Sequence, residues 1–128
     1  MTSILIDTDI LIDIANNDEL AKNRLIDESR NSTLVVSVIT VMELTVGCRN
    51  KIEIQNMNRF LTQFQIVTLT PQISNRAIQL LRNYYLSHGL LIPDALIAAS
   101  AIEQKIPLLS KNQRDFRFIQ DLNLLTYP

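Results

Sequence analysis

Two acids follow directly on a buried strand near the start of the chain, and this arrangement limits the possible folds more than any other feature. Ile4 to Ile6 is predicted to form a short strand buried on both faces, Asp7 and Asp9 come next, and the apolar run then resumes. A carboxylate at the end of a buried strand needs a hydrogen bond, an opposite charge or a metal ion, because an unpaired buried charge is costly. The carboxyl ends of strands are also where open α/β sheets bind ligands. Asp7 is therefore a candidate functional residue, although capping of a helix that begins near Ile10 explains the same pattern.

Strand and helix patterns alternate along the rest of the chain. Further strands are predicted at 33–37, 66–69, 108–110 and, at the edge, 124–125. Helices are predicted at 10–15, 18–30, 38–46, 51–65, 71–88, 93–104 and 116–120. The helix at 38–46 has one apolar, core-facing side that consists of Ile39, Met42 and Val46. Because this alternation is typical of a helix-covered parallel sheet, we expect a three-layer α/β/α sandwich with a mainly parallel central sheet.

The size and composition of the chain exclude several classes of protein. Its 128 residues are enough to bury a core, and we expect residues 1–128 to form a single domain. Cys48 is the only cysteine, so an internal disulfide is excluded, and the formal net charge of -1 means that any polyanion must be held locally. No apolar run reaches the roughly 18 residues of a membrane helix, and early acids interrupt any signal segment. We therefore expect a soluble, cytoplasmic protein with no membrane partner.

Four acids are placed so that a parallel sheet would bring them to one edge. Asp7 follows the first strand, Glu43 lies at the border of an apolar helix face, Asp94 lies in the first turn of a helix, and Asp115 comes just after a strand. Strand-to-helix junctions of a parallel sheet share one edge, so these carboxylates are predicted to converge. Two such charges about 4 Å apart repel by roughly 4 kcal/mol at an effective dielectric of about 20, which favours a bound divalent cation. Oxygen ligands suit Mg²⁺ or Mn²⁺ better than Zn²⁺.

The chain resembles a PIN-domain ribonuclease, in particular the toxin of VapBC-type toxin–antitoxin pairs, over essentially its full length. The resemblance rests on four segments in this order: the opening LIDTDILID, ELTVG at 43–47, PDALIAA at 93–99 and LSKNQRDF at 109–116. It implies that the catalytic and metal-binding acids are Asp7, Glu43, Asp94 and Asp115. It implies polar support from Ser110 and Asn112. Asp9 stands where the family usually has an amide or small polar residue and would add a charge, whereas Ser110 replaces the usual Thr and keeps the hydroxyl.

The resemblance also implies a reaction and its partners. One or two Mg²⁺ or Mn²⁺ ions held by the four acids would activate water for hydrolysis of RNA, leaving a 5′-phosphate and a 3′-hydroxyl. Candidate contacts to the flanking phosphates are Lys111, Arg114, Arg117 and Arg49, for which a solvated surface is the alternative explanation. A homodimer is implied, as is an antitoxin that covers the acidic pocket with a basic side chain.

Three other functions fit part of the sequence. A phosphatase of the haloacid dehalogenase type would also place Asp7 and Asp9 after a buried strand, but position 11 is Leu11 and no later acidic pair with a suitable Lys follows. A response-regulator receiver would need a phosphoacceptor Asp after a central strand, and 66–71 offers none. A PIN-like module that binds RNA or protein without cutting is the third alternative, and the complete set of acids argues against it.

Several conspicuous residues are expected to be structural. His88 stands beside Gly89 at a predicted helix end, where a capping role or an interaction with the helix dipole accounts for it. Cys48 is expected to be a small core residue. Tyr84, Tyr85 and the phenylalanines lack the paired spacing of a base-stacking sheet, so packing in the core or in a dimer is expected for them.

Overall fold

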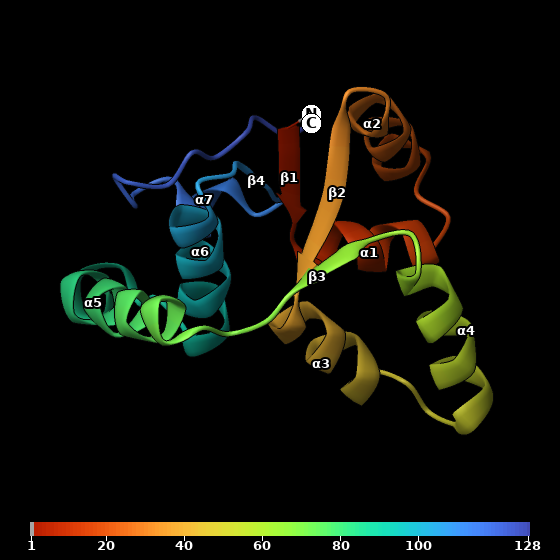
Figure 1. The fold of residues 1–128 in the computed structure, drawn as a ribbon, viewed down its shortest axis with the longest axis horizontal. Helices are drawn as coiled ribbons and strands as arrows, with labels where there is room; N and C mark the ends of the chain where they lie inside the picture. The colour runs from red at the N-terminus through yellow and green to blue at the C-terminus, as the bar shows by residue number, and fades with distance from the viewer. Residues whose placement is uncertain (1) are drawn as a thin grey trace.

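The computed structural model describes residues 2–128, and its centre is a parallel sheet of four strands (Figure 1). The strands are β1 (Thr2–Ile6), β2 (Ser32–Ser37), β3 (Gln65–Val67) and β4 (Leu108–Leu109), in the spatial order β3-β2-β1-β4. Every neighbouring pair is parallel, and Leu124 adds a single parallel bridge beside Leu108. The predicted parallel sheet is confirmed, with an isolated bridge in place of a strand at 124–125.

Helices cover both faces of this sheet. Within residues 2–128 they are α1 (Thr8–Ala15), α2 (Glu19–Ser29), α3 (Val38–Val46), α4 (Lys51–Leu61), α5 (Pro71–His88), α6 (Ile92–Gln104) and α7 (Gln113–Phe116). The prediction that α4 extends to 65 is wrong, because Gln65 already pairs with Val35 in the sheet. The last helix was predicted at 116–120 and lies earlier, because Arg117 donates its backbone N–H to Gln113 O at 2.9 Å and closes the short turn there.

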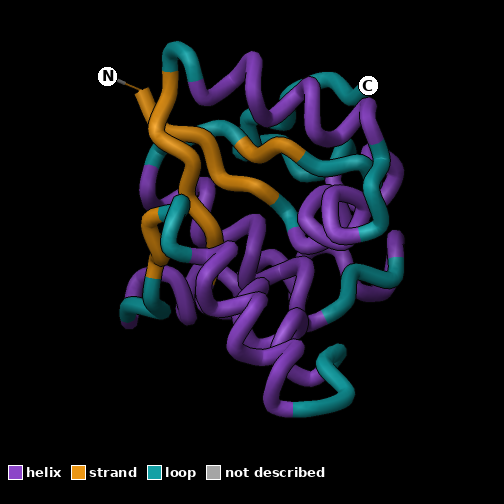
Figure 2. The backbone as a smooth tube through the Cα atoms, turned by 90° about the vertical axis from the view of Figure 1, so that its right-hand side faces the viewer, coloured by secondary structure: helices purple, strands orange, loops and turns teal. Residues whose placement is uncertain are grey.

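Two core clusters, one on each face of the sheet, make the three-layer sandwich. Side chains alternate along a strand, so Leu5, Val35 and Leu108 pack on the side of α5 and α6, whereas Ile6, Val36 and Leu109 pack on the side of α1, α2 and α4. Figure 1 shows the two groups of helices on opposite sides of the sheet, and Figure 2 shows the strands lying side by side. The buried alanines of α6 let its backbone approach the sheet closely.

The apolar side predicted for α3 is only partly buried. Ile39 packs against the core, but Met42 is 54% exposed and Val46 84% exposed. The helix continues from the carboxyl end of β2 and lies beyond the sheet rather than across its face, so its second half has no sheet to cover (Figure 1). The expectation of a core position for Cys48, just after this helix, is likewise corrected, since the side chain is only half-buried. None of the helices within residues 2–128 has the length and apolar character needed to span a membrane.

The order of the strands places the ends of β1 and β4 side by side. From β1 the chain moves outward through β2 and β3, and α5 and α6 then carry it back to β4 on the other side of β1. The backbone N–H of Asp7 donates to Leu109 O at 2.9 Å across this junction. Ligands of open parallel sheets bind where the strand order reverses in this way, outside the carboxyl ends of the strands.

Candidate active site

Asp7 lies at the junction of β1 and β4 and is held by two hydrogen bonds. Its side chain is 5% exposed; Oδ1 accepts from the Thr8 backbone N–H at 2.8 Å, and Oδ2 accepts from Ser110 Oγ at 2.8 Å. Asp7 therefore caps α1, as one of the two interpretations of the sequence proposed, and also faces the strand junction. Burial, followed by the negative charge of Asp9, raises the pKa of Asp7 to about 7, although the two hydrogen bonds oppose this shift.

Asp9 adds a further carboxylate to the same junction. It lies in the first turn of α1, with Oδ2 at 3.4 Å from Ser110 Oγ and Oδ1 at 3.4 Å from the Lys111 backbone nitrogen. Burial raises the pKa of Asp9, and its charge raises the pKa of both Asp7 and Asp94. Asp9 is thus part of the same acidic group as Asp7 and Asp94.

Asp94 faces this group from α6. It lies in the first turn of the helix and is half-buried, and burial raises its pKa to about 6. Asp115, Glu43 and Asp9 raise that pKa further, so their charges are close enough to act on one another. The five acids, Asp7, Asp9, Glu43, Asp94 and Asp115, form what we call the acidic pocket. Within residues 2–128 none of them is in an ion pair with a Lys, Arg or His side chain.

Glu43 comes from α3 and is hydrogen-bonded to the Thr8 hydroxyl, which is itself hydrogen-bonded to the Thr40 hydroxyl. Thr8 Oγ1 donates to Glu43 Oε1 at 2.7 Å and lies 2.9 Å from Thr40 Oγ1. Because the single hydroxyl proton of Thr8 is given to Glu43, the Thr40 hydroxyl donates to Thr8 in turn. Both threonines are buried, and their role was not predicted from the sequence. Two features of the sequence could have indicated this role: Thr8 lies between two acids, and Thr40 lies about one helical turn before Glu43.

The segment after β4 carries two further residues of the predicted site, Asn112 and Asp115. Asp115 on α7 is half-buried and accepts a hydrogen bond from the Asn112 side-chain amide, while the Asn112 backbone N–H donates to Ser110 Oγ at 3.0 Å. Asn112 therefore connects Asp115 to the serine that holds Asp7. The predicted polar support and the predicted acids lie together in the structure.

The predicted phosphate-binding cations differ in whether they are already paired. Lys111 forms an ion pair with Asp13 at 3.0 Å. Arg114 and Arg117 are exposed, and neither is in an ion pair within residues 2–128. The two arginines are therefore free to contact an anion beside Asp115.

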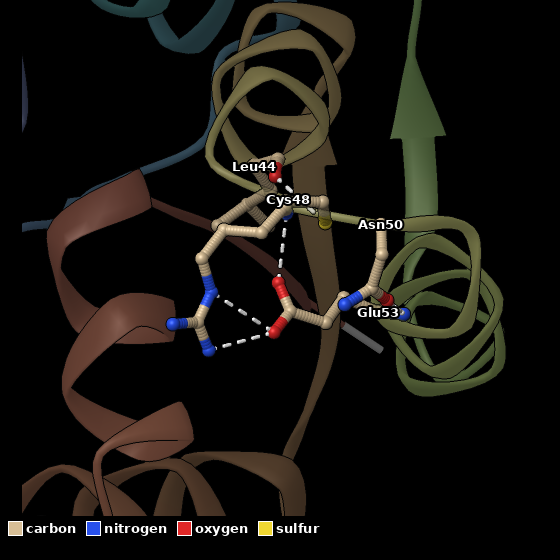
Figure 3. Close-up of polar contacts among 5 residues, drawn as sticks. Leu44, Cys48, Asn50 and Glu53 are labelled. Atoms are coloured by element: carbon tan, nitrogen blue, oxygen red, sulfur yellow. Dashed lines mark hydrogen bonds and ion pairs between the residues drawn. The ribbon is translucent and has the colours of Figure 1, made fainter.

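A groove of about 790 Å³ runs past Glu43, and Arg49 lies on its wall. The guanidinium of Arg49 donates to Glu53 Oε2 at 2.9 and 3.2 Å, and Figure 3 shows Glu53 at the start of α4 close to Asn50. Arg49 is thus paired with Glu53 in the structure, in an ion pair that is exposed to solvent. The groove also has apolar walls, which include Leu11, Leu44 and Phe60.

The chemistry of the donor set fits a hard divalent cation. All the candidate ligands are carboxylate oxygens, which Mg²⁺ and Mn²⁺ prefer. Burial and the charges of neighbouring carboxylates raise the pKa of Asp7 and of Asp94, and a cation among these acids would offset both effects. Among residues 2–128 no three Asp, Glu, His or Cys side chains form a group that could hold a metal ion as the structure stands.

Comparison with known proteins gives a consistent set of relatives. The family model for the PIN domain matches residues 4–121. Ribonuclease VapC10 of Mycobacterium tuberculosis is 32% identical over 120 residues, which are 93% of this chain and 90% of the relative. A toxin-antitoxin complex from Klebsiella pneumoniae contains a chain with 31% identity and a TM-score of 0.81, with 97% of each chain covered. VapBC2 from Rickettsia felis, solved with a promoter DNA fragment, gives 25% identity and a TM-score of 0.83, with 99% and 100% covered.

Proposed function

The chain belongs to the PIN-domain family as a ribonuclease of the VapC type, and we propose that its acidic pocket is the site at which it cuts RNA. It is an endoribonuclease and the toxin of a toxin–antitoxin pair. This membership decides against the phosphatase and receiver alternatives. The observation that carries the proposal is the convergence of five carboxylates from four parts of the chain on one strand junction, none of them in an ion pair with a Lys, Arg or His side chain of residues 2–128.

We propose Asp7, Glu43, Asp94 and Asp115 as the ligands of one or two Mg²⁺ or Mn²⁺ ions, with Asp9 adding negative charge. Divalent-metal dependence is a property of the VapC-type PIN nucleases, and the oxygen donors of this chain suit it. When bound, such an ion lowers the pKa of water and neutralises the phosphate under attack. Cleavage is proposed to leave a 5′-phosphate and a 3′-hydroxyl.

Neighbouring residues hold the carboxylates in the positions proposed for binding a metal ion. Ser110 and the Thr8 backbone fix the two oxygens of Asp7, and the Thr8 hydroxyl fixes one oxygen of Glu43. Donors to a carboxylate stabilise its ionised form, which is the form that binds a cation. The guanidinium groups of Arg114 and Arg117, which are in no ion pair within residues 2–128, are the proposed contacts to RNA phosphates. Such contacts give affinity without sequence choice.

We propose a cognate antitoxin as the protein partner of this chain. The related structures from Klebsiella pneumoniae and Rickettsia felis are a toxin-antitoxin complex and VapBC2. In this chain the groove beside Glu43 offers apolar walls that end at the acidic pocket, so an antitoxin segment lying there could place a basic side chain among the acids. We also propose that the chain forms a homodimer and is located in the cytoplasm.

Cleavage of total cellular RNA by the purified chain tests the proposed function. Discrete fragments are expected with Mg²⁺ or Mn²⁺, and none with EDTA or with Asp7→Asn. Asp27→Asn is the matched control, because Asp27 is an exposed acid on α2 outside the pocket and its loss leaves the five carboxylates in place. A folded chain that binds RNA but does not cut it with either metal would instead support the binding module.

A further inference from the structure

A second hollow, of about 390 Å³, adjoins the acidic pocket on the side of Asp115. It lies between the end of α5 and the segment around α7, and its walls are formed by Ser87, His88, Arg114, Asp115, Arg117 and Phe118. Asp115 belongs to both places, since it lines this hollow and its charge acts on Asp94 in the acidic pocket. The hollow and the acidic pocket are therefore neighbours that share the Asp115 side chain.

One wall of this hollow is a stack of two aromatic rings. The His88 imidazole lies over the Phe118 ring with centroids 4.1 Å apart and planes 16° apart, and Tyr84 supports both rings at 5.9 and 5.2 Å. The helix end itself is formed by Gly89, whose φ of 68° is left-handed and whose N–H donates to Tyr85 O. Gly89 therefore forms the C-cap, whereas His88 lies in the last turn of α5, where the helix-dipole alternative places it. The exposed His88 ring also stacks on Phe118.

Two arginine side chains also line the hollow. Arg114 and Arg117 are three positions apart on the α7 turn, both are exposed, and neither is in an ion pair within residues 2–128. A guanidinium presents several donors in one plane and matches the oxygens of a phosphate. The aromatic rings and the guanidinium groups, which can donate hydrogen bonds to a phosphate, thus line the same hollow.

We propose that this hollow binds the RNA nucleotide next to the scissile phosphate, with its base stacked on His88 and its phosphate between Arg114 and Arg117. The inference rests on the proposed function and adds a subsite to it. Every base has an aromatic face, so stacking here gives affinity and fixes the position of the strand without selecting a sequence. The alternative is that the His88 and Phe118 rings only pack α5 against the segment after α7.

A tryptophan reporter separates these two explanations, because the chain contains no Trp. His88→Trp keeps an aromatic ring in the hollow, and Tyr85→Trp places the reporter on the same helix at an exposed position that does not line it. The probes are octaadenylate RNA and an abasic ribose-phosphate oligomer of the same length, both in EDTA at low salt. We expect octaadenylate to quench the fluorescence of His88→Trp, the abasic oligomer to leave it unchanged, and Tyr85→Trp to respond to neither.

Affinities of the same probes complete the test. By fluorescence anisotropy, His88→Ala is expected to weaken octaadenylate binding about fivefold or more and to leave abasic binding unchanged. Arg114→Gln is expected to weaken both, because both probes carry phosphates. Equal quenching of the two reporters, or unchanged octaadenylate affinity in a folded His88→Ala chain that still cuts RNA, overturns the subsite alone. A wild-type chain that neither binds these probes nor cuts RNA overturns the subsite together with the proposed function.

Discussion

Ser110 Oγ lies 2.8 Å from Asp7 Oδ2 and so connects the end of β4 to the acid that follows β1. These residues are 103 positions apart in the chain and meet because β1 and β4 are parallel neighbours. The same hydroxyl lies 3.4 Å from Asp9 Oδ2 and accepts from the Asn112 backbone. One serine therefore holds the most deeply buried acid of the pocket and connects it to the segment that carries Asp115.

Removing this hydroxyl is expected to raise the pKa of Asp7. A donor to the ionised carboxylate stabilises that form, so Ser110→Ala should shift the protonation of Asp7 to a pH above its present value of about 7. The carboxyl carbon chemical shift of Asp7, followed by NMR against pH in the metal-free chain, measures this. Ser110→Thr keeps the hydroxyl and should leave the pKa near its present value. An unchanged pKa in Ser110→Ala would show that the hydrogen bond has no such effect.

Asp94→Asn is expected to preserve the fold and to abolish cleavage. The amide has the shape of the carboxylate without its charge, and burial already disfavours the charged form at this position. The melting temperature should therefore stay level or rise. Cleavage of RNA should fall by at least about 100-fold, the upper end of the loss that follows removal of a residue that only supports a metal ligand. Circular dichroism and the cleavage assay measure the two effects, with Asp27→Asn as control. Unfolding of Asp94→Asn would mean that Asp94 is structural.

The metal-free chain is expected to lose stability as the pH rises from about 4 to about 7. The pKa of Asp7 is raised from its ordinary value of 3.8 to about 7, so between these values the folded chain holds a proton that the unfolded chain has released. At about 1.4 kcal/mol for each pH unit, the decrease attributable to Asp7 is roughly 4 kcal/mol. Urea unfolding at several pH values measures it.

Asp7→Asn supplies the control for this pH dependence, because the amide does not titrate. Its free energy of unfolding should change less between pH 4 and 7, with a remainder from Asp94, whose pKa is raised to about 6. Stability of the wild-type chain that increases with pH over this range would contradict the raised pKa of both acids.

Strand positions and the acids that follow them were predictable from sequence, because both depend on neighbouring residues. Ile4 to Ile6 is a buried apolar run, and Asp7 follows it at once. Features that depend on the packing of distant segments were not predictable. The exposure of Val46 depends on α3 lying beyond the sheet, and the position of His88 over Phe118 depends on α5 meeting the segment after α7.

The role of Thr8 was not predicted from its neighbours in the sequence either, because its hydrogen-bond partners Thr40 and Glu43 come from α3. Thr8→Val has nearly the same shape but leaves the Thr40 hydroxyl without its acceptor and Glu43 Oε1 without its donor. We expect a loss of roughly 1–3 kcal/mol in the free energy of unfolding, the usual cost of unsatisfied buried polar groups. Cleavage should fall as well, since Glu43 is no longer held in the pocket, and Thr8→Ser should restore both properties. Urea unfolding and the RNA cleavage assay measure them, and a Thr8→Val chain with wild-type stability and activity would show that the hydroxyl chain from Thr40 to Glu43 has no function.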